Sequence, residues 1–349
     1  MSSVGQQLRG GVHRRWIGHH ASLERVAVAE VESVTLRGYG QAMTRWDELL
    51  AAMPVAIDGG LASELEARGH DLTGTLWSAR LLADDPQAIV DVHRAYFAAG
   101  ATVGVSASYQ ASRAGFVRHG RSEEQADELL ALSVDLVRRG RELARGDGAD
   151  QPMLVAASVG PYGATLHDGS EYRGNYGVPH EDLVAFHSER IAVLVAAEPD
   201  LLAVETVPDI DEARAIVAAL DAAGGGLPTW LSFSCADSAT TCAGQPIERA
   251  AELVAEADSV AAIGVNCTAP EHIEELIGRI RRTAADLPVV VYPNAGRVWD
   301  GQASVWRGEG ADVFPPEAIQ DWLAAGAALV GGCCGLGPDA IRGVVDVVR

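Results

Sequence analysis

The chain has 349 residues, of which 48% are hydrophobic, so it can bury the core of one large or two smaller domains. Its formal net charge of −21 argues against nucleic acid and anionic membranes as partners. The sequence contains no lysine, which excludes both Schiff-base catalysis and the phosphate-binding lysine of a P-loop. It shows no signal peptide and no apolar run of membrane-spanning length, and its five cysteines lack a disulfide spacing pattern. We therefore expect a cytoplasmic protein.

Residues 1–45 differ from the rest of the chain, because six arginines face only three acidic residues in an otherwise acidic protein. They show no strong periodicity before Thr35. This composition predicts a disordered N-terminal extension, or a stretch upstream of the true start, for which Met43 is an alternative. Residues 46–349 are predicted to form a single domain.

From Pro54 onward, short apolar runs typical of buried strands alternate with longer helical segments. The predicted strands are 55–57, 102–106, 153–157, 201–204, 229–233, 261–265, 288–292 and 327–330. The predicted helices are 86–99, 122–144, 180–197, 209–223, 247–257, 270–284, 315–325 and 338–348. Ser122 and Gln125 have the spacing of a capping box at the start of the second helix. Eight strands, each followed by a helix, predict an α/β protein with a (β/α)₈ TIM barrel, and an open doubly wound sheet is the alternative.

Three cysteines lie at the ends of two predicted strands. Cys267 ends the sixth strand, and the adjacent Cys333 and Cys334 follow the eighth. Both strands neighbour the seventh, so the three thiols can meet at the carboxyl ends of the barrel strands, where barrel enzymes place their chemistry. Three thiolates suit Zn²⁺ and leave its fourth position open, whereas a disulfide between adjacent cysteines would be strained. Buried apolar cysteines and an oxidisable pair are the alternatives.

Two carboxylates also follow predicted strands: Asp58 after the first and Glu205 after the fourth. Burial of a carboxylate without a partner is costly, so these side chains could bind a substrate ammonium group. A helix cap for Asp58 and a structural ion pair for Glu205 are the alternatives. Cys235 and Cys242 are interpreted as bystanders, although a closed four-thiol structural site that includes Cys235 is conceivable.

A long loop after the third strand, residues 160–177, is rich in glycine and tyrosine. Long loops on the catalytic face of a barrel are usually lids or binding surfaces. The tyrosines of this loop could face a sulfonium through cation–π attraction, or they could pack within the loop.

Several stretches together resemble the homocysteine S-methyltransferase family, and the similarity is greatest to the branch that uses S-methylmethionine. They span nearly the whole chain after the N-terminal extension and comprise residues 58–65, 108–112, 158–163, 168–174, 205–208, 264–268, 291–294 and 331–334. The thiol pattern with its flanking glycines, Gly331-Gly332-Cys333-Cys334, is the most specific of them.

The resemblance implies a (β/α)₈ barrel that transfers a methyl group to homocysteine and so makes methionine. It implies a catalytic zinc ion held by Cys267, Cys333 and Cys334. The expected substrate-binding residues, all within the matching stretches, are Asp58, Gln110, Glu205 and Asn266. The expected donor is S-methylmethionine, with S-adenosylmethionine as a second possibility. Thr206 stands where the betaine-using branch has an aromatic residue, which disfavours betaine. Selenocysteine as the acceptor and a non-catalytic barrel with structural zinc are the alternatives.

Overall fold

The structure is a computed structural model, and it describes residues 40–72, 77–224, 226–296, 298–300, 305–307 and 310–349. Residues 42–349 form one compact unit, which contains all the strands of the described residues. Within the described residues, no helix combines the length and the apolar character needed to cross a membrane. The predicted extension of residues 1–45 lies almost entirely outside the described residues.

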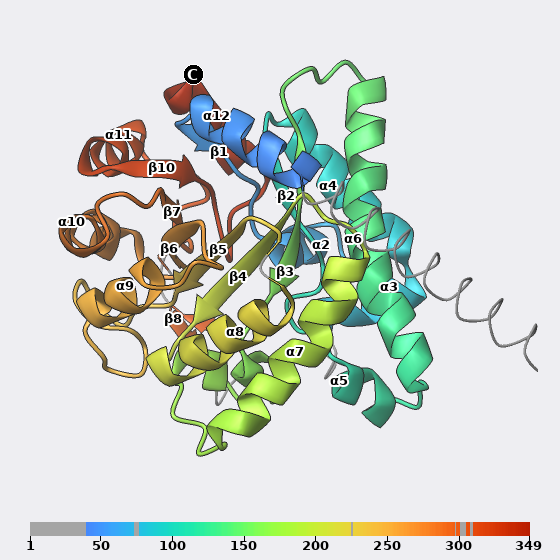
Figure 1. Ribbon diagram of the computed structural model, residues 1–349. Helices are drawn as coiled ribbons and strands as arrows, with labels where there is room; N and C mark the ends of the chain where they lie inside the picture. Colours follow the sequence, from blue (N-terminus) through green and yellow to red (C-terminus); the bar gives the residue numbers. More distant parts are fainter. Residues whose placement is uncertain (1–39, 73–76, 225, 297, 301–304, 308–309) are drawn as a thin grey trace, which may run out of the picture. The chain divides into compact units, whose positions relative to one another are not determined.

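The described residues form one sheet of eight parallel strands that closes into a barrel (Figure 1). In chain order the strands are β1 (Val55–Ala56), β2 (Val103–Val105), β3 (Leu154–Val159), β4 (Leu201–Val207), β5 (Thr229–Phe233), β6 (Ala262–Asn266), β7 (Val289–Tyr292) and β10 (Ala327–Val330). The hydrogen-bonded order runs β1-β10-β7-β6-β5-β4-β3-β2. A parallel bridge between Ile57 and Val103 then joins β1 to β2. The eight predicted strands and the (β/α)₈ barrel are confirmed, and the open sheet is excluded.

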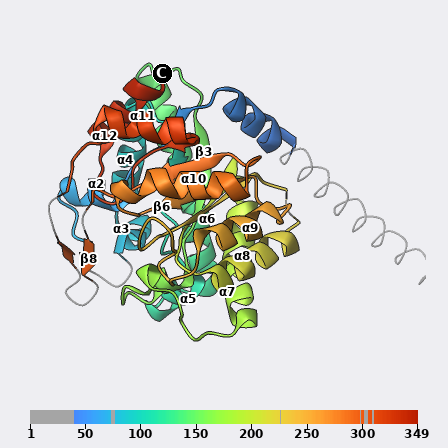
Figure 2. The ribbon, with the colours of Figure 1, turned by 90° about the vertical axis from the view of Figure 1, so that its left-hand side faces the viewer.

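Helices between the strands form the outer layer of the barrel (Figures 1 and 2). The predicted helices appear as α4 (Pro86–Ala98), α6 (Glu123–Gly146), α7 (His180–Ala196), α8 (Ile210–Ala222), α9 (Ile247–Ala255), α10 (Ile273–Thr283), α11 (Pro316–Ala325) and α12 (Pro338–Val348). The capping box of α6 is present, with Ser122 and Gln125 satisfying each other's backbone N–H groups. Its presence explains why this helix boundary could be predicted from sequence.

Further short elements lie in the connections. The α-helical ones are α2 (Leu61–Ala67), α3 (Leu81–Asp84) and α5 (Arg113–Arg118). The 3₁₀ turns are η1 (Trp77–Arg80), η2 (Tyr162–Thr165), η3 (Ser170–Tyr172) and η4 (Pro270–His272). A two-stranded antiparallel hairpin, β8 (Val298–Asp300) with β9 (Val305–Arg307), is inserted between β7 and α11. The sequence analysis did not predict this hairpin.

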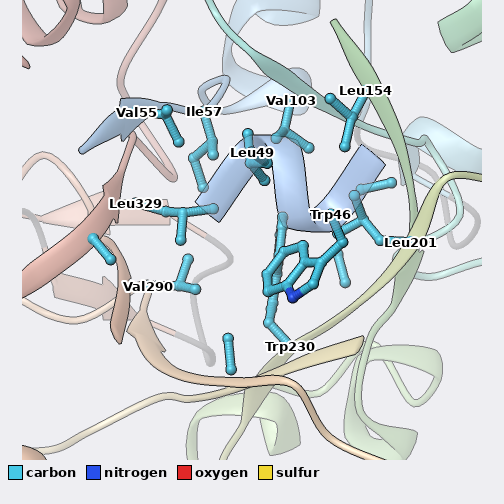
Figure 3. Packing of buried hydrophobic residues seen from close by; sticks show 14 of the residues in the cluster. Trp46, Leu49, Val55, Ile57, Val103, Leu154, Leu201, Trp230, Val290 and Leu329 are labelled. Atoms are coloured by element: carbon cyan, nitrogen blue, oxygen red, sulfur yellow. The ribbon is translucent and has the colours of Figure 1, made fainter. Parts of the chain in front are cut away.

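A helix over residues 40–51 precedes the barrel and spans the predicted boundary between residues 45 and 46. Ala42, Trp46 and Leu49 are buried along one face of this helix, at the spacing of an amphipathic helix. Trp46 and Leu49 belong to the same apolar cluster as Leu201 and Trp230, which lie at the beginnings of their strands (Figure 3). Residues 42–51 therefore close the amino-terminal end of the barrel and leave its carboxyl-terminal mouth for the functional site.

Candidate metal centre and substrate pocket

The three predicted thiols come together at the carboxyl-terminal mouth of the barrel. The sulfur atoms of Cys267, Cys333 and Cys334 lie within 4.8 Å of one another. Sγ of Cys334 is 3.4 Å from Sγ of Cys267 and 3.9 Å from that of Cys333. Cys235 and Cys242 are not part of this group, so a four-thiol site is not formed.

The sulfur separations fit tetrahedral zinc coordination. Zn–S bonds of about 2.3 Å place neighbouring sulfur ligands about 3.8 Å apart in a tetrahedron, which matches the separations in this group. Cys333 and Cys334 are partly exposed while Cys267 is buried, so the group opens toward the mouth. Three ligands with an accessible side are typical of catalytic zinc sites, whereas structural sites are closed by four protein ligands.

Close backbone packing brings the loop after β10 against the loop after β1. A Cβ atom on Gly60 would lie 2.5 Å from the carbonyl oxygen of Cys333, and one on Gly331 would lie 2.4 Å from Ile57. Both contacts are too short for any side chain, so glycine is required at both positions. Cys267 itself has φ of 49°, a left-handed conformation that non-glycine residues adopt rarely and that is often found at functional sites.

The thiols share protons in the absence of metal. Hydrogen bonds from Cys333 and Cys334 hold the pKa of Cys267 well below its ordinary value. The pKa values of Cys333 and Cys334 are raised, first by their hydrogen bonds to Cys267. A metal ion that binds all three as thiolates therefore has to displace protons from the group.

Asp58 and Glu205, the two predicted carboxylates, are buried at the same mouth. Oδ2 of Asp58 accepts a hydrogen bond of 2.7 Å from the Val105 N–H, and Glu205 accepts one from the Ser158 hydroxyl. Burial raises the pKa of Glu205 to about 7. Burial also raises the pKa of Asp58, and the charge of Glu205 adds to this shift. Two carboxylates that repel each other in a buried site favour a cation between them.

Asn266 does not present free polar atoms to the mouth. Its Oδ1 accepts hydrogen bonds of 2.7 Å from both the Thr206 N–H and the Ser232 hydroxyl. Its Nδ2 donates to Oγ1 of Thr206, also at 2.7 Å. Thr206 has φ of 59°, so Asn266 holds in place the strained residue that follows Glu205. The geometry favours a positioning role for Asn266 rather than the direct substrate contact expected from the sequence.

Gln110 lies in the turn after β2 and is buried. Its Oε1 has no hydrogen-bond partner among the described residues. Buried polar atoms are nearly always hydrogen-bonded, so this oxygen is available to a bound molecule.

The aromatic loop brings two further residues to the thiols, to which the sequence analysis gave no individual role. The Tyr172 hydroxyl lies 3.3 Å from Sγ of Cys267. Its neighbour Glu171 is 8% exposed, and burial raises the pKa of its carboxyl to about 7. Both lie within one of the matching stretches, and the tyrosines of the loop were predicted as candidates for sulfonium contact.

The fold and the thiol group define the class: a (β/α)₈ barrel with a candidate metal site at the carboxyl ends of its strands. A sequence profile of the homocysteine S-methyltransferase family matches residues 55–348, and the chain belongs to this family.

Individual relatives cover most of the chain. Homocysteine S-methyltransferase 4 of Zea mays is 43% identical over 305 residues, which are 84% of this chain and 89% of the relative. The metallated form of the homocysteine methyltransferase MmuM from Escherichia coli superimposes with a TM-score of 0.74 at 40% identity, over 84% of this chain and 95% of that one. The selenocysteine methyltransferase of Astragalus bisulcatus is 37% identical over 317 residues, 85% of this chain and 93% of the relative.

Proposed function

We propose that the protein transfers a methyl group from a sulfonium donor to the sulfur of homocysteine, with zinc as its cofactor, and so forms methionine. The observation that carries this proposal is the group of three thiols within 4.8 Å of one another, beside two buried carboxylates. Membership of the homocysteine S-methyltransferase family supports it.

Cys267, Cys333 and Cys334 would hold the zinc ion. When bound, zinc would keep a substrate thiol deprotonated at neutral pH, where a free thiol with a pKa of about 8.5 is mostly protonated. The similarity to a metallated relative supports a metal in this position.

The carboxylates of Asp58 and Glu205 would bind the ammonium group of homocysteine. An ammonium between them would relieve their mutual repulsion and lower the pKa of Glu205 from about 7, which keeps it ionised. Gln110 would supply an acceptor through its unpaired Oε1. Asn266 would fix Thr206, and with it the end of β4 that carries Glu205.

The transfer itself is a displacement at carbon. The sulfur of homocysteine donates an electron pair to the donor's methyl carbon, and a new S–CH₃ bond forms. The bond between that carbon and the donor sulfur breaks, and its electron pair stays with the donor, which becomes a neutral thioether. Holding both substrates in one mouth makes this reaction effectively unimolecular, which accounts for much of the acceleration.

S-methylmethionine is the proposed donor, and S-adenosylmethionine is a second one. Both carry a methyl sulfonium, whose positive charge suits a mouth lined by thiols and carboxylates. The buried Arg190 of α7 donates to the backbone carbonyls of Ser108, Tyr109 and Gly160, and its charge offsets only part of the rise that burial causes in the pKa of Glu205.

The test is methionine formation by zinc-loaded protein with homocysteine and either donor, alongside Cys333→Ala and Cys242→Ser. We expect one zinc per chain and turnover for the wild type. Cys333→Ala should lose its zinc, and its activity should fall by more than about 100-fold. Loss of a group that only orients a metal ligand already lowers metal affinity or activity by about 10–100-fold, and Cys333 is a proposed ligand itself.

Cys242→Ser is the matched control, because Cys242 lies outside the thiol group, and it should keep both zinc and activity. A Cys333→Ala protein that retains zinc and turnover would contradict the proposal. Full zinc occupancy without turnover of either donor would favour the structural-zinc alternative.

Selenocysteine is a second candidate acceptor, favoured by the similarity to a selenocysteine methyltransferase. Competition between homocysteine and selenocysteine at equal concentrations, with the methylated products measured by mass spectrometry, ranks the two. A product mixture dominated by methylselenocysteine would replace homocysteine as the proposed acceptor.

A further inference from the structure

The 3₁₀ turn η3 delivers two consecutive side chains to the thiol group. Tyr172 touches Cys267 through its hydroxyl, as described above. Glu171 is more than nine-tenths buried, and its Oε2 has no hydrogen-bond partner within the described part of the chain. Because the adjacent Tyr172 contacts Cys267, the segment that carries Glu171 lies at the mouth. Burial is the main cause of the raised pKa of Glu171, and the charge of Cys267 adds to it.

Tyr109 faces the same space from the turn after β2. Burial is the main cause of the raised pKa of the Tyr109 hydroxyl, and the charges of Glu171 and Cys267 raise this pKa further. The charges of Glu171 and Cys267 thus both act on the Tyr109 hydroxyl, while Tyr172, next to Glu171 in sequence, contacts Cys267 directly. A buried carboxylate among aromatic rings is an environment that attracts organic cations.

Among the described residues, no buried cation pairs with Glu171, and the charge of the exposed Arg173 is only a minor influence on its pKa. Its sequence neighbour Arg173 has a side chain that is 63% exposed and pairs with Asp168 at 3.6 Å. Arg173 also donates to the Ser170 hydroxyl at 2.9 Å. The guanidinium of Arg190 is occupied by three backbone carbonyls. A buried carboxylate oxygen without a hydrogen-bond partner is costly, so we expect a bound molecule to supply the partner of Oε2.

Each substrate of the proposed reaction carries a cationic group, the ammonium of homocysteine and the sulfonium of the donor, and buried carboxylates reach the mouth from separate segments of the chain. The proposed function assigns Asp58 and Glu205, both buried, to the homocysteine ammonium, and the charge of Glu205 adds to the raised pKa of Asp58. Glu171 comes from a different segment, the loop after β3. It is therefore available to the second molecule, the methyl donor.

We propose that Glu171 is the donor-binding carboxylate: it receives the positive charge of the sulfonium donor and selects cationic donors over neutral ones. This inference rests on the proposed function. Because the sulfonium charge disappears during transfer, a carboxylate beside it stabilises the bound donor at least as much as the transition state. Glu171 should therefore act on the KM of the donor and not on kcat.

The experiment compares Glu171→Gln with Glu205→Gln in steady-state assays that vary donor and acceptor separately. In Glu171→Gln we expect the KM for S-methylmethionine to rise at least about tenfold, with kcat maintained and the KM for homocysteine within about twofold, because a buried charge-assisted contact is lost. In Glu205→Gln the KM for homocysteine should rise, while the KM for S-methylmethionine should stay nearly the same. Glu171→Asp keeps the charge and should recover part of the donor affinity.

Glu181→Gln is the matched control, because Glu181 lies in the exposed first turn of α7 and its change removes the same charge from the surface. Glu181→Gln should leave kcat and the KM values for donor and acceptor unchanged. Zinc content and melting temperature of all variants, measured in parallel, identify a variant that fails to fold. An unchanged donor KM in folded Glu171→Gln, or an equal rise of both KM values, would overturn the inference.

Calorimetric binding gives a readout that does not depend on turnover. S-methylmethionine and methionine differ by one methyl group and one positive charge. Zinc-loaded wild type should prefer S-methylmethionine, and Glu171→Gln should lose about tenfold of that preference. Wild type that binds S-methylmethionine with this preference but forms no methionine would contradict the proposed function alone, whereas equal preference in both proteins would contradict the role of Glu171 alone.

Discussion

At the scale of single residues, the site depends on strained backbone at the ends of two strands. Thr206 after β4 and Cys267 after β6 both have positive φ, at 59° and 49°. The Asn266 side chain bridges them, because it precedes Cys267 in sequence and holds both the N–H and the hydroxyl of Thr206. The sequence predicted that Asn266 is at the mouth but could not show that its polar atoms are satisfied within the protein.

The raised pKa of Glu205 predicts a pH dependence of homocysteine binding. Burial raises this pKa to about 7, so the carboxylate loses its charge as the pH falls through 7, while the homocysteine ammonium stays protonated. Between pH 8 and pH 6, the KM for homocysteine should rise about tenfold in the wild type, following the ionised fraction of the carboxyl. In Glu205→Gln, which leaves the three thiols in place, the KM for homocysteine should not show this rise. If the KM of both proteins changed with pH in the same way, Glu205 would not be the group that titrates.

At the scale of elements, buried carboxylates anchor the loop of residues 160–177: Asp209 accepts from the Asn175 N–H at 2.9 Å, and Glu212 holds both ends of the loop. Glu212 of α8 accepts hydrogen bonds from the Tyr162 N–H at 2.5 Å and the Tyr176 hydroxyl at 2.9 Å. It also contacts Nε2 of the buried His187 at 2.9 Å. These three contacts tie the two ends of the loop to α7 and α8, and the loop in turn carries Glu171 and Tyr172 to the thiols.

Removal of this anchor should loosen the loop. Glu212→Ala leaves three buried polar groups without their partner, and we expect the free energy of unfolding to fall by about 3 kcal/mol. The loop should also become a site of faster proteolysis. Asp211→Ala is the control on the same helix, because the Asp211 side chain is 74% exposed and pairs only with Arg214, and it should change stability by less than about 0.5 kcal/mol. Denaturant unfolding measures the stability of both variants. If Glu212→Ala were as stable as Asp211→Ala, Glu212 would not anchor the loop.

The helix over residues 40–51 is a second element with a defined task, which is to cover the amino-terminal end of the barrel. Trp46→Ala removes a ring that is 3% exposed, and it should lower the free energy of unfolding by about 3–5 kcal/mol. Because the site lies at the opposite end, kcat/KM of the folded protein should stay unchanged. Met43→Ala, at a residue that is 43% exposed on the same helix, should alter stability by less than about 0.5 kcal/mol. A loss of specific activity in folded Trp46→Ala would show that the two ends of the barrel are coupled.

At the scale of the whole molecule, every strand that the structure describes and every proposed site residue follows Met43. A chain that begins at Met43 should therefore bind zinc and form methionine within about twofold of the full chain. A chain that begins at Pro54 lacks Trp46 and Leu49 and should unfold at much lower denaturant concentration. Inactivity of the folded Met43 chain would show that residues 1–42 contribute to function.

The amino-acid sequence was sufficient to predict the barrel, which the structure confirms, and to propose three cysteines as metal ligands, whose thiols the structure brings together. Apolar runs and helix caps are local signals, and a closed parallel sheet places the ends of all its strands at one mouth, so Cys267, Cys333, Cys334, Asp58 and Glu205 could be placed together before the structure was known. The contacts between individual atoms, at the mouth and elsewhere, could be read only from the three-dimensional structure. Tyr172 contacts Cys267 across 95 residues and Arg45 pairs with Asp200 across 155, and no local pattern encodes such distances. Three features depend on packing between segments that are far apart in the chain. They are the hydrogen bonds that occupy the Asn266 side chain, the Glu171 oxygen without a partner and the helix that covers the barrel. Periodicity and strand-end position do not specify such packing.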